Sequence, residues 1–328
     1  MAESQEPQLS LRLGSKASWL AYVAEQLGYF KDENLAVTLL NKQEIKDLEA
    51  GGDRLEAQVN WFQHAVFGVV NGKPQLAVMV LHDSPGITVM VSDAAKDEVR
   101  SAADFAGRRI AEGASHSAKG IVTSYLATRA GLPSGSYTPV MAAVDGRREA
   151  VTQGLQEGTV DVLTFMEPMT SYMKETGLVS TLYDLGTRDS TVAELGAVWP
   201  AESVLVTPEF AKDHPEAVQG LVNAMARTLE YVRSSTPEQI AELLSSTYLA
   251  GKETAEAVQA IAKRWPTLSQ GEYTISPESA QLIIDAIKAC PFDDTVSGQT
   301  RAKVKTVDID PSTLYTNSFV QEQSAVAS

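Results

Sequence analysis

Apolar positions at the start of the chain follow two spacings, one typical of strands and one typical of helices. Residues 9–13 alternate apolar and polar side chains and lead into a loop of small and polar residues, 14–18. Apolar side chains then recur at helical spacing over residues 19–27, and residues 36–40 form a second apolar run. The pattern predicts a strand, an amphipathic helix that stops at Gly28, and another strand.

The same alternation continues through the chain. Beyond about residue 237 the pattern is mainly helical, and the tail from Val304 is polar and predicted to be extended. Alternating strands and helices of these lengths predict an α/β sheet. Further predicted strands occupy residues 76–81, 87–91, 160–166 and 203–206, and further helices occupy residues 118–130 and 215–232.

Two predicted loops follow strands and precede helices, which is where ligands bind in open α/β sheets. Free backbone N–H groups at such helix starts attract anions. The first loop offers Ser15, Lys16 and Ser18, and Trp19 follows it. Lys16 either neutralises an anion or is a solvated surface residue, and Trp19 either stacks on a ring or packs in the core.

The second such loop contains Ser115, His116 and Ser117. Hydroxyl and N–H groups at a helix start suit a carboxylate, sulfonate or phosphate. The alternative is that Ser115 or Ser117 caps the helix and contacts no ligand. We include all three residues in the predicted ligand site.

Other candidates lie near the ends of further apolar segments. Pro85 and Gly86 form a strand-to-strand turn, where glycine allows close approach of the backbone. Glu167, at the end of an apolar strand, binds a ligand amine or holds a neighbouring donor. The last candidates are four successive residues, Trp61, Phe62, Gln63 and His64. Their two aromatic rings, amide and imidazole suit a pocket for a flat ligand, and the alternative is a helix that packs on the core.

Composition narrows the function classes. The net charge of −15 argues against nucleic acid and anionic membranes as partners, and no apolar run is long enough to span a membrane. The single cysteine, Cys290, cannot form an internal disulfide or a cysteine-rich zinc site. No catalytic, phosphate-loop or dinucleotide motif is present, so we predict neither enzymatic activity nor a cofactor. A metal site from His64, His116 and Glu167 is conceivable but not predicted.

Four blocks resemble, in the same order, the solute-binding proteins of ABC importers that bind nitrate, taurine, alkanesulfonates and thiamine-precursor pyrimidines. The first is YVAEQLGYFKDENLAV at residues 22–37, and the second is SAADFAGRRI at 101–110 with the loop at 113–117. The third joins GLQEGTVDV at 154–162 to MEP at 166–168. The fourth joins VTPEFA at 206–211 to HPEAVQ at 214–219, and LYTNSFV at 314–320 matches tails in one subgroup.

This resemblance implies a type II periplasmic-binding-protein fold, with two α/β lobes, a two-crossing hinge and a ligand cleft between the lobes. Lobe 1 is expected at residues 9–91 and 204–328, and lobe 2 at residues 92–203. The implied function is capture of a small organic anion, an aromatic carboxylate or sulfonate, and its delivery to an ABC permease. The implied protein is a periplasmic or other extracytoplasmic monomer, with or without a lipid anchor. Residues 1–5 lack the apolar core of a signal peptide, so we expect a mature form without its export signal.

Two departures from the family pattern leave the ligand open. The first loop lacks the Asn and His of the pyrimidine binders, and residues 57–64 (AQVNWFQH) replace a block that is usual in the family. These differences weaken the case for the familiar sulfonate, nitrate and pyrimidine ligands. The pattern resembles a subgroup of the same superfamily, and that resemblance implies import of aromatic acids. The alternatives are an enzyme of cofactor biosynthesis on the same fold, binding of a thiamine-precursor pyrimidine, or a ligand sensor for a membrane kinase or receptor.

Overall fold

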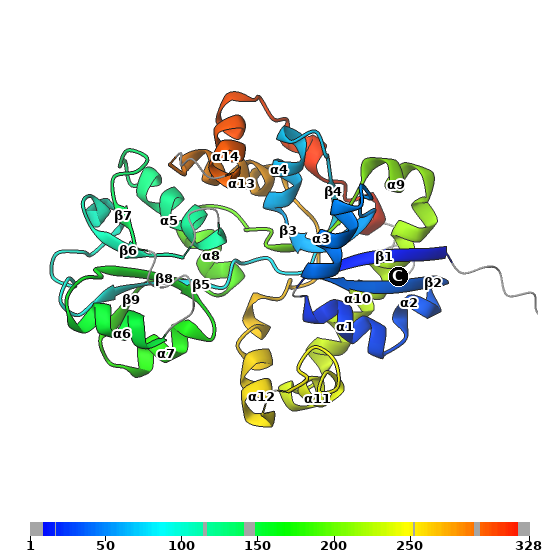
Figure 1. The fold of residues 1–328 in the computed structure, drawn as a ribbon, viewed down its shortest axis with the longest axis horizontal. Coiled ribbons are helices and arrows are strands. Elements are labelled where there is room, and N and C mark those ends of the chain that lie inside the picture. Colours follow the sequence, from blue (N-terminus) through cyan, green and yellow to red (C-terminus); the bar gives the residue numbers. More distant parts are fainter. Residues whose placement is uncertain are drawn as a thin grey trace, which may run out of the picture. The chain divides into compact units, whose positions relative to one another are not determined.

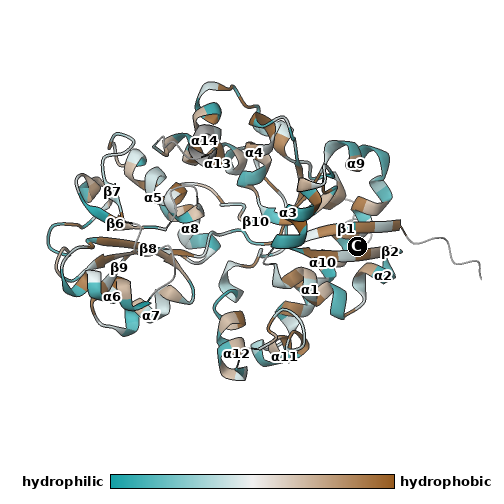
Figure 2. Ribbon diagram, viewed as in Figure 1, coloured by the Kyte–Doolittle hydropathy of each residue, from teal (hydrophilic) through white to brown (hydrophobic). Residues whose placement is uncertain are grey.

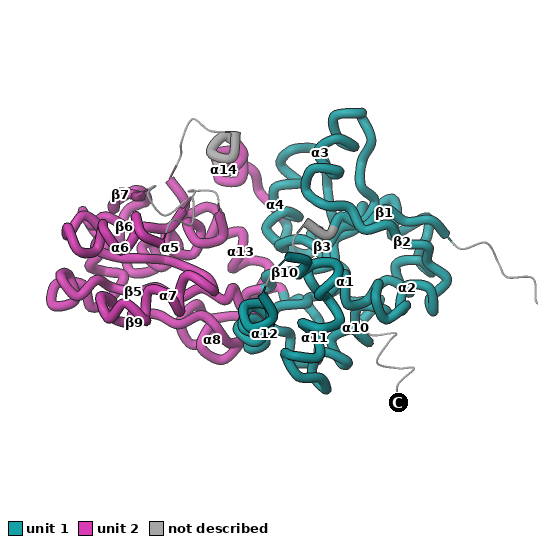
Figure 3. The backbone as a smooth tube through the Cα atoms, turned by 60° about the horizontal axis from the view of Figure 1, so that its bottom comes forward, with its two compact units in different colours: residues 1–82, 200–276, 310–328 teal, residues 83–199, 277–309 magenta. Residues whose placement is uncertain are grey.

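The computed structural model describes residues 9–16, 18–113, 117–140, 148–251, 253–291 and 296–320, and it contains two compact units (Figure 1). Unit 1 comprises residues 1–82, 200–276 and 310–328, and unit 2 comprises residues 83–199 and 277–309 (Figure 3). Within the described residues each unit has its own five-stranded sheet. The α/β class predicted from the sequence is therefore confirmed.

Unit 1 is built on a mixed sheet with the strand order β2-β1-β3-β10-β4. β1 runs parallel to β2 and β3, whereas β10 lies antiparallel between β3 and β4. The carboxyl ends of β1 to β4 therefore meet the amino end of β10 at one edge, which we call the carboxyl edge of unit 1. The strands are β1 (Leu9–Lys16), β2 (Leu35–Asn41), β3 (Ala57–Trp61), β4 (Leu76–Val80) and β10 (Glu202–Val206).

Helices of unit 1 cover this sheet and bury its apolar residues. Leu11 and Leu13 of β1 lie in the core, and Figure 2 shows hydrophobic residues along β1 and β2. The longest helix, α10, packs against α1 and α2 and begins at Pro215, as the sequence predicts. The helices are α1 (Trp19–Gln26), α2 (Tyr29–Asp32), α3 (Lys42–Ala50), α4 (Gln63–Val70), α9 (Pro208–Asp213), α10 (Pro215–Ser234), α11 (Pro237–Leu243) and α12 (Thr254–Ala262), with 3-10 turns at Trp265–Thr267 and Pro311–Leu314.

Unit 2 repeats this plan with the strand order β7-β6-β8-β5-β9. β6 runs parallel to β7 and β8, and β5 lies antiparallel between β8 and β9. The carboxyl ends of β6 and β8 therefore meet the amino end of β5 at the carboxyl edge of unit 2. The strands are β5 (Ile87–Ser92), β6 (Arg109–Ala111), β7 (Thr138–Pro139), β8 (Val162–Met166) and β9 (Val179–Leu185).

The helices of unit 2 include two from the C-terminal part of the chain. They are α5 (Ala118–Arg129), α6 (Arg148–Gln156), α7 (Met169–Glu175), α8 (Arg188–Leu195), α13 (Pro277–Ala289) and α14 (Val296–Thr306), with a 3-10 turn at Ala102–Phe105. The expectation of an extended tail from Val304 is wrong at its start, because Val304 is fully buried within α14.

The division of the chain differs in three places from the lobes that the resemblance implied. Residues 83–91 belong to unit 2 and not to lobe 1, because β5 pairs with β8 and β9. Residues 200–203 belong to unit 1 and not to lobe 2, because β10 pairs with β3 and β4. Residues 277–309 belong to unit 2, whereas the sequence analysis gave them to lobe 1. The physical reason is that α13 packs its apolar side against α5, and Ser134 Oγ donates a hydrogen bond to the Ala289 carbonyl oxygen at 2.8 Å. The chain consequently passes between the units at residues 276–277 and 309–310, in addition to 82–83 and 199–200.

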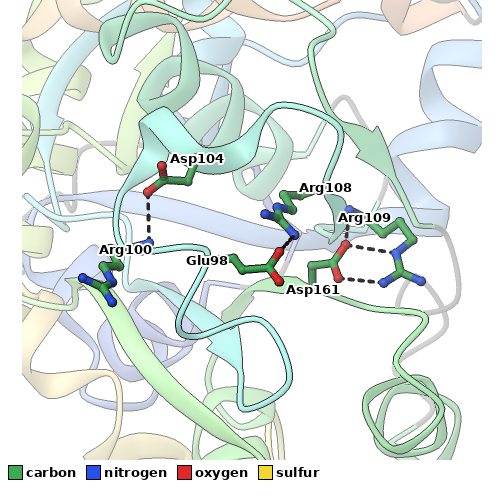
Figure 4. Close-up of polar contacts among 6 residues, drawn as sticks. All are labelled: Glu98, Arg100, Asp104, Arg108, Arg109 and Asp161. Atoms are coloured by element: carbon green, nitrogen blue, oxygen red, sulfur yellow. Dashed lines mark hydrogen bonds and ion pairs between the residues drawn. The ribbon is translucent and has the colours of Figure 1, made fainter.

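A buried carboxylate joins β6 to the segment before β8 (Figure 4). The backbone N and Nε of Arg109 donate to Asp161 Oδ2 at 2.8 and 3.0 Å, and Nη2 donates to Oδ1 at 2.7 Å. Burial raises the pKa of Asp161, but the hydrogen bonds and charge of Arg109 outweigh burial and hold it below its usual range. Asp161 therefore stabilises the sheet of unit 2 in its ionised form.

Asp161→Asn should lower the free energy of unfolding by about 1.5–3 kcal/mol at neutral pH, because the amide cannot replace the charge-assisted hydrogen bonds. The folded-state pKa is depressed, so the wild-type advantage is present above the ordinary aspartate pKa and is lost as pH falls through the folded value. Urea unfolding at neutral and acidic pH measures this loss.

Glu98→Gln is the control for that measurement. It removes an exposed ion pair of 2.8 Å with Arg108, drawn in the same figure, and should change stability by less than about 1 kcal/mol (Figure 4). Equal losses in the two variants would contradict a special role for Asp161.

Candidate functional site

The carboxyl edge of unit 1 brings together three polar side chains that are far apart in the sequence. Ser18 precedes α1, His82 follows β4, and Glu202 begins β10. Ser18 Oγ donates a hydrogen bond to Glu202 Oε2 at 3.0 Å, and His82 Nδ1 lies 3.4 Å from the same oxygen. We call these three residues the Glu202 cluster.

Backbone hydrogen bonds fix the positions of His82 and Glu202. The N–H groups of Leu81 and His82 both donate to the Glu202 carbonyl oxygen, at 2.8 and 3.1 Å, and Ala201 N donates to the His82 carbonyl oxygen at 2.9 Å. The geometry of the cluster is therefore set by the same ladder of bonds that holds β10 in the sheet.

Burial controls the charge of the Glu202 cluster. Burial, followed by the positive charge of Arg264, lowers the pKa of His82 to about 3, so its imidazole is neutral at physiological pH. Burial raises the pKa of Glu202 to about 7, against the opposing effects of the Ser18 hydrogen bond and Arg264. Near neutral pH the carboxyl group of Glu202 therefore exists in both protonation states.

Several residues predicted for the ligand site lie at the ends of strands or the start of a helix in unit 1. Trp61 is half-buried and is the register partner of Glu202 across the β3–β10 pair. Gln63 is buried at the start of α4, and within the described part of the chain its Oε1 has no hydrogen-bond partner. Ser15 and Lys16 form the end of β1, but their side chains lie outside the description.

Two aromatic residues predicted for the site lie in the core instead. Trp19 is 0% exposed, and its ring stacks on Trp265 with centroids 6.3 Å apart. Phe62 is also 0% exposed. The core-packing alternative weighed for Trp19 therefore describes its place in this structure.

His64 lines a cavity of about 650 Å³ between α3 and α4. Its ring meets Phe67 edge-on, with centroids 5.9 Å apart. Both charge signs line the cavity, through Lys42, Lys46, Arg54, Lys73, Glu49 and Asp53.

The carboxyl edge of unit 2 carries a second group of polar residues, around the start of α5. Ser117 Oγ accepts a hydrogen bond from Gly120 N at 3.4 Å and so caps this helix. Ser115 and His116 lie outside the described residues. Of the two serines of this loop, only Ser117 lies within the described residues, and its hydroxyl caps the helix.

Lys119, in the first turn of α5, brings a positive charge to this edge. Its Nζ lies 5.5 Å from the ring centroid of Phe165 in β8 and close to Gly113, where an added Cβ would lie only 3.0 Å from it. Burial lowers the pKa of Lys119, and the negative charge of Glu112 opposes that shift. Lys119 is thus a partly desolvated cation between the ends of β6 and β8.

Glu112 is held by hydroxyl groups within unit 2. It is 1% exposed, and Tyr137 Oη donates to its Oε2 at 2.8 Å. Ser124 Oγ lies 3.0 Å from the same Tyr137 oxygen. Burial, followed by the charge of Glu112, raises the pKa of Tyr137, so the phenol stays a neutral donor to the carboxylate.

The remaining predicted residues have structural partners in unit 2. Glu167 accepts hydrogen bonds from Ser171 N at 3.2 Å and Ser171 Oγ at 3.0 Å, which supports the reading that it holds a neighbouring donor. Pro85 is buried, and Gly86 has a φ of +63° and donates its N–H to the Leu185 carbonyl oxygen at 3.0 Å. The positive φ explains the glycine at this turn.

Three residues of these edges were not among the candidates predicted from the sequence, namely His82, Glu202 and Lys119. His82 lies in the predicted turn before residue 87, Glu202 directly precedes a predicted strand, and Lys119 lies in a predicted first helical turn. Each position was visible at a strand or helix end. The hydrophobic pattern could not predict the contact between Ser18 and Glu202, because these residues are 184 positions apart.

Two kinds of site are absent from the part of the chain that the structure describes. No three His, Cys, Asp or Glu side chains gather there in an arrangement that could hold a metal ion. Among the same residues, no helix combines the length and apolar character needed to cross a bilayer.

The family model described as NMT1/THI5 like matches residues 18–240, which is more than half of the chain. The chain belongs to this family. The match includes the whole Glu202 cluster and the start of α5. No curated protein sequence matches the chain.

Solved structures with the same fold include binding proteins and an enzyme. The periplasmic aliphatic sulphonate binding protein SsuA from Escherichia coli is 18% identical, with 86% of each chain covered and a TM-score of 0.63. The periplasmic nitrate-binding protein NrtA from Synechocystis is 13% identical, with 98% of this chain and 90% of that chain covered and a TM-score of 0.60. The desulfurization enzyme DSZB is 12% identical, with 98% of this chain and 100% of that chain covered and a TM-score of 0.60, and a cysteine-to-serine mutant of it is known in complex with biphenyl-2-sulfinic acid. This NMT1/THI5-like chain therefore has the periplasmic-binding-protein fold.

Glu202→Gln should make the protein more stable at alkaline pH and not at acidic pH. The raised folded-state pKa means that stability is fully present below the ordinary value of 4.5 and is lost as pH rises to about 7. The variant lacks this loss, so its advantage should grow by about 3 kcal/mol over that interval. Urea unfolding at several pH values measures the difference.

Glu209→Gln removes an equal charge from an exposed position on α9 and is the matched control. Its effect on stability should vary little with pH. If Glu202→Gln gains the same unfolding free energy at pH 4.5 and above pH 7, burial does not raise the pKa of Glu202.

Proposed function

We propose that this protein is an extracytoplasmic solute-binding protein of an ABC importer, which captures a small organic anion and delivers it unchanged to a membrane permease. Membership of the NMT1/THI5-like family and a fold shared with sulphonate- and nitrate-binding proteins support the proposal. It acts as a monomer in the periplasm or an equivalent compartment. The idea that both units contribute to one ligand site remains a prediction from the sequence.

The observation that carries the anion-binding role is the position of Lys119. Its amino group lies at the carboxyl edge of unit 2, where ligands bind in sheets of this kind. Partial desolvation strengthens the attraction of this cation for an incoming anion, because charges interact more strongly where water is excluded. The N–H groups at the start of α5 add to the positive potential.

We propose an aromatic carboxylate or sulfonate as the ligand class. The half-buried Trp61 offers a ring surface near the carboxyl edge of unit 1. The complex of DSZB with biphenyl-2-sulfinic acid is a precedent for an aromatic sulfur oxyacid on this fold. Of the residues predicted from sequence, Ser15, Lys16, Ser115 and His116 remain proposed ligand contacts.

We also propose that the bound solute undergoes no reaction. Because DSZB is an enzyme on the same fold, this part needs its own test. Prolonged incubation with each ligand that binds, followed by mass analysis of the solute, should recover it unchanged. A product that accumulates with protein concentration would favour the enzyme alternative.

Lys119→Met should weaken the binding of organic anions by about tenfold or more, because it removes the charge that the ligand neutralises. Calorimetric titration with benzoate, phthalate, benzenesulfonate, taurine and nitrate measures the effect, after a thermal-shift screen. A ligand at about 100 times its Kd should stabilise the fold by about 2.7 kcal/mol.

Two further variants sharpen this test. Lys174→Met removes an exposed cation near the end of α7 and should leave affinity unchanged. Lys119→Arg keeps the charge and should retain most of the binding. Failure of every compound to bind the wild type, or equal affinity in the wild type and Lys119→Met, would refute the anion-binding role.

A further inference from the structure

Among the described residues, one carboxylate oxygen of the Glu202 cluster has no hydrogen-bond partner. Oε2 receives the hydrogen bond from Ser18, whereas no group among the described residues donates to Oε1. The side chain is 17% exposed, so a small solute can reach it although it is largely buried. Oε1 is therefore an acceptor available to a ligand.

No cation of the described residues compensates the charge of this carboxylate at close range. His82 is the one basic side chain there with a nitrogen within 4.0 Å of it, and burial keeps that imidazole neutral. Arg264, whose charge is felt at Glu202, directs its Nη1 to Tyr248 Oη at 3.3 Å. A buried carboxylate in such surroundings favours any ligand that brings a positive charge or N–H donors.

Two neighbouring features fit the same kind of ligand group. Directly paired residues on adjacent antiparallel strands project to the same face of a sheet, so Trp61 and Glu202 share a face. An indole beside a carboxylate provides a cation–π partner for an ammonium group. Gln63 adds a second buried oxygen acceptor without a partner in the described residues, two positions after Trp61.

We propose that Glu202 is a specificity-determining residue that binds an amino group, so that the preferred solutes are organic acids that carry an amino substituent. This inference rests on the proposed solute-binding function and deepens it. Glu202 Oε1 accepts the N–H of the ligand, Ser18 holds Oε2 in place, and Trp61 covers the amino group. The acidic group of the solute binds to the cationic groups of the proposed site.

The test compares matched pairs of solutes that differ in the amino group. The pairs are taurine and ethanesulfonate, sulfanilate and benzenesulfonate, and para-aminobenzoate and benzoate. In calorimetric titrations at pH 8, where Glu202 is mostly ionised, the wild type should bind the amino member of at least one pair about tenfold more tightly.

Variants then assign any preference to Glu202. Glu202→Gln should lose affinity for the amino member by about tenfold more than for its partner. Glu209→Gln, with the same change of charge at an exposed position, should keep the preference. Circular dichroism and thermal melting establish that both variants are folded.

The outcomes separate this inference from the function on which it rests. Binding of both members of every pair with equal affinity overturns the role of Glu202 and leaves anion binding intact. A preference that survives in Glu202→Gln also overturns it. Binding of none of the six compounds rejects the proposed anion-binding function, and the inference with it.

Discussion

Strand direction is the constraint on which both candidate sites depend. In each unit one strand lies antiparallel to its neighbours, β10 in unit 1 and β5 in unit 2, and it begins at the edge where the parallel strands end. The chain enters unit 1 at Pro200 and unit 2 at Asp83, shortly before these strands. The first residues of each antiparallel strand therefore join the loops that follow the other strands. This topology places Glu202 beside Ser18 and His82, and Gly86 beside the end of β9.

The buried carboxyl groups at the two carboxyl edges have different surroundings. Glu112 in unit 2 accepts a hydrogen bond from the Tyr137 hydroxyl and interacts electrostatically with Lys119. Glu202 in unit 1 receives only the Ser18 hydroxyl among the described donors and keeps one oxygen open. Unit 2 thus offers a cation to a solute, and unit 1 offers an acceptor. The proposed preference for solutes with both an acidic group and N–H donors rests on this difference.

The sequence predicted the element types well because burial imposes a period on each element. It predicted the α/β class and the helix from Pro215 from local pattern alone, whereas it gave capping by Ser117 only as the alternative to ligand binding. It assigned residues 277–309 to lobe 1, because the periodicity of α13 shows that one side is buried but not that α5 buries it. It missed Glu202, because the contact with Ser18 depends on the sheet order and on no local feature.

Packing and stability do not explain a glutamate at position 202. Glutamine has nearly the same shape and would avoid the free-energy cost of ionising a buried acid, so a chain optimised for stability would favour the amide. Asp161 is the opposite case within the same molecule, because three hydrogen bonds from Arg109 make its carboxylate stabilising. Glu202 lowers folded stability, has one oxygen without a partner among the described residues, and lies where ligands bind in this class of sheet. Recognition of a solute therefore explains this glutamate better than a structural role does.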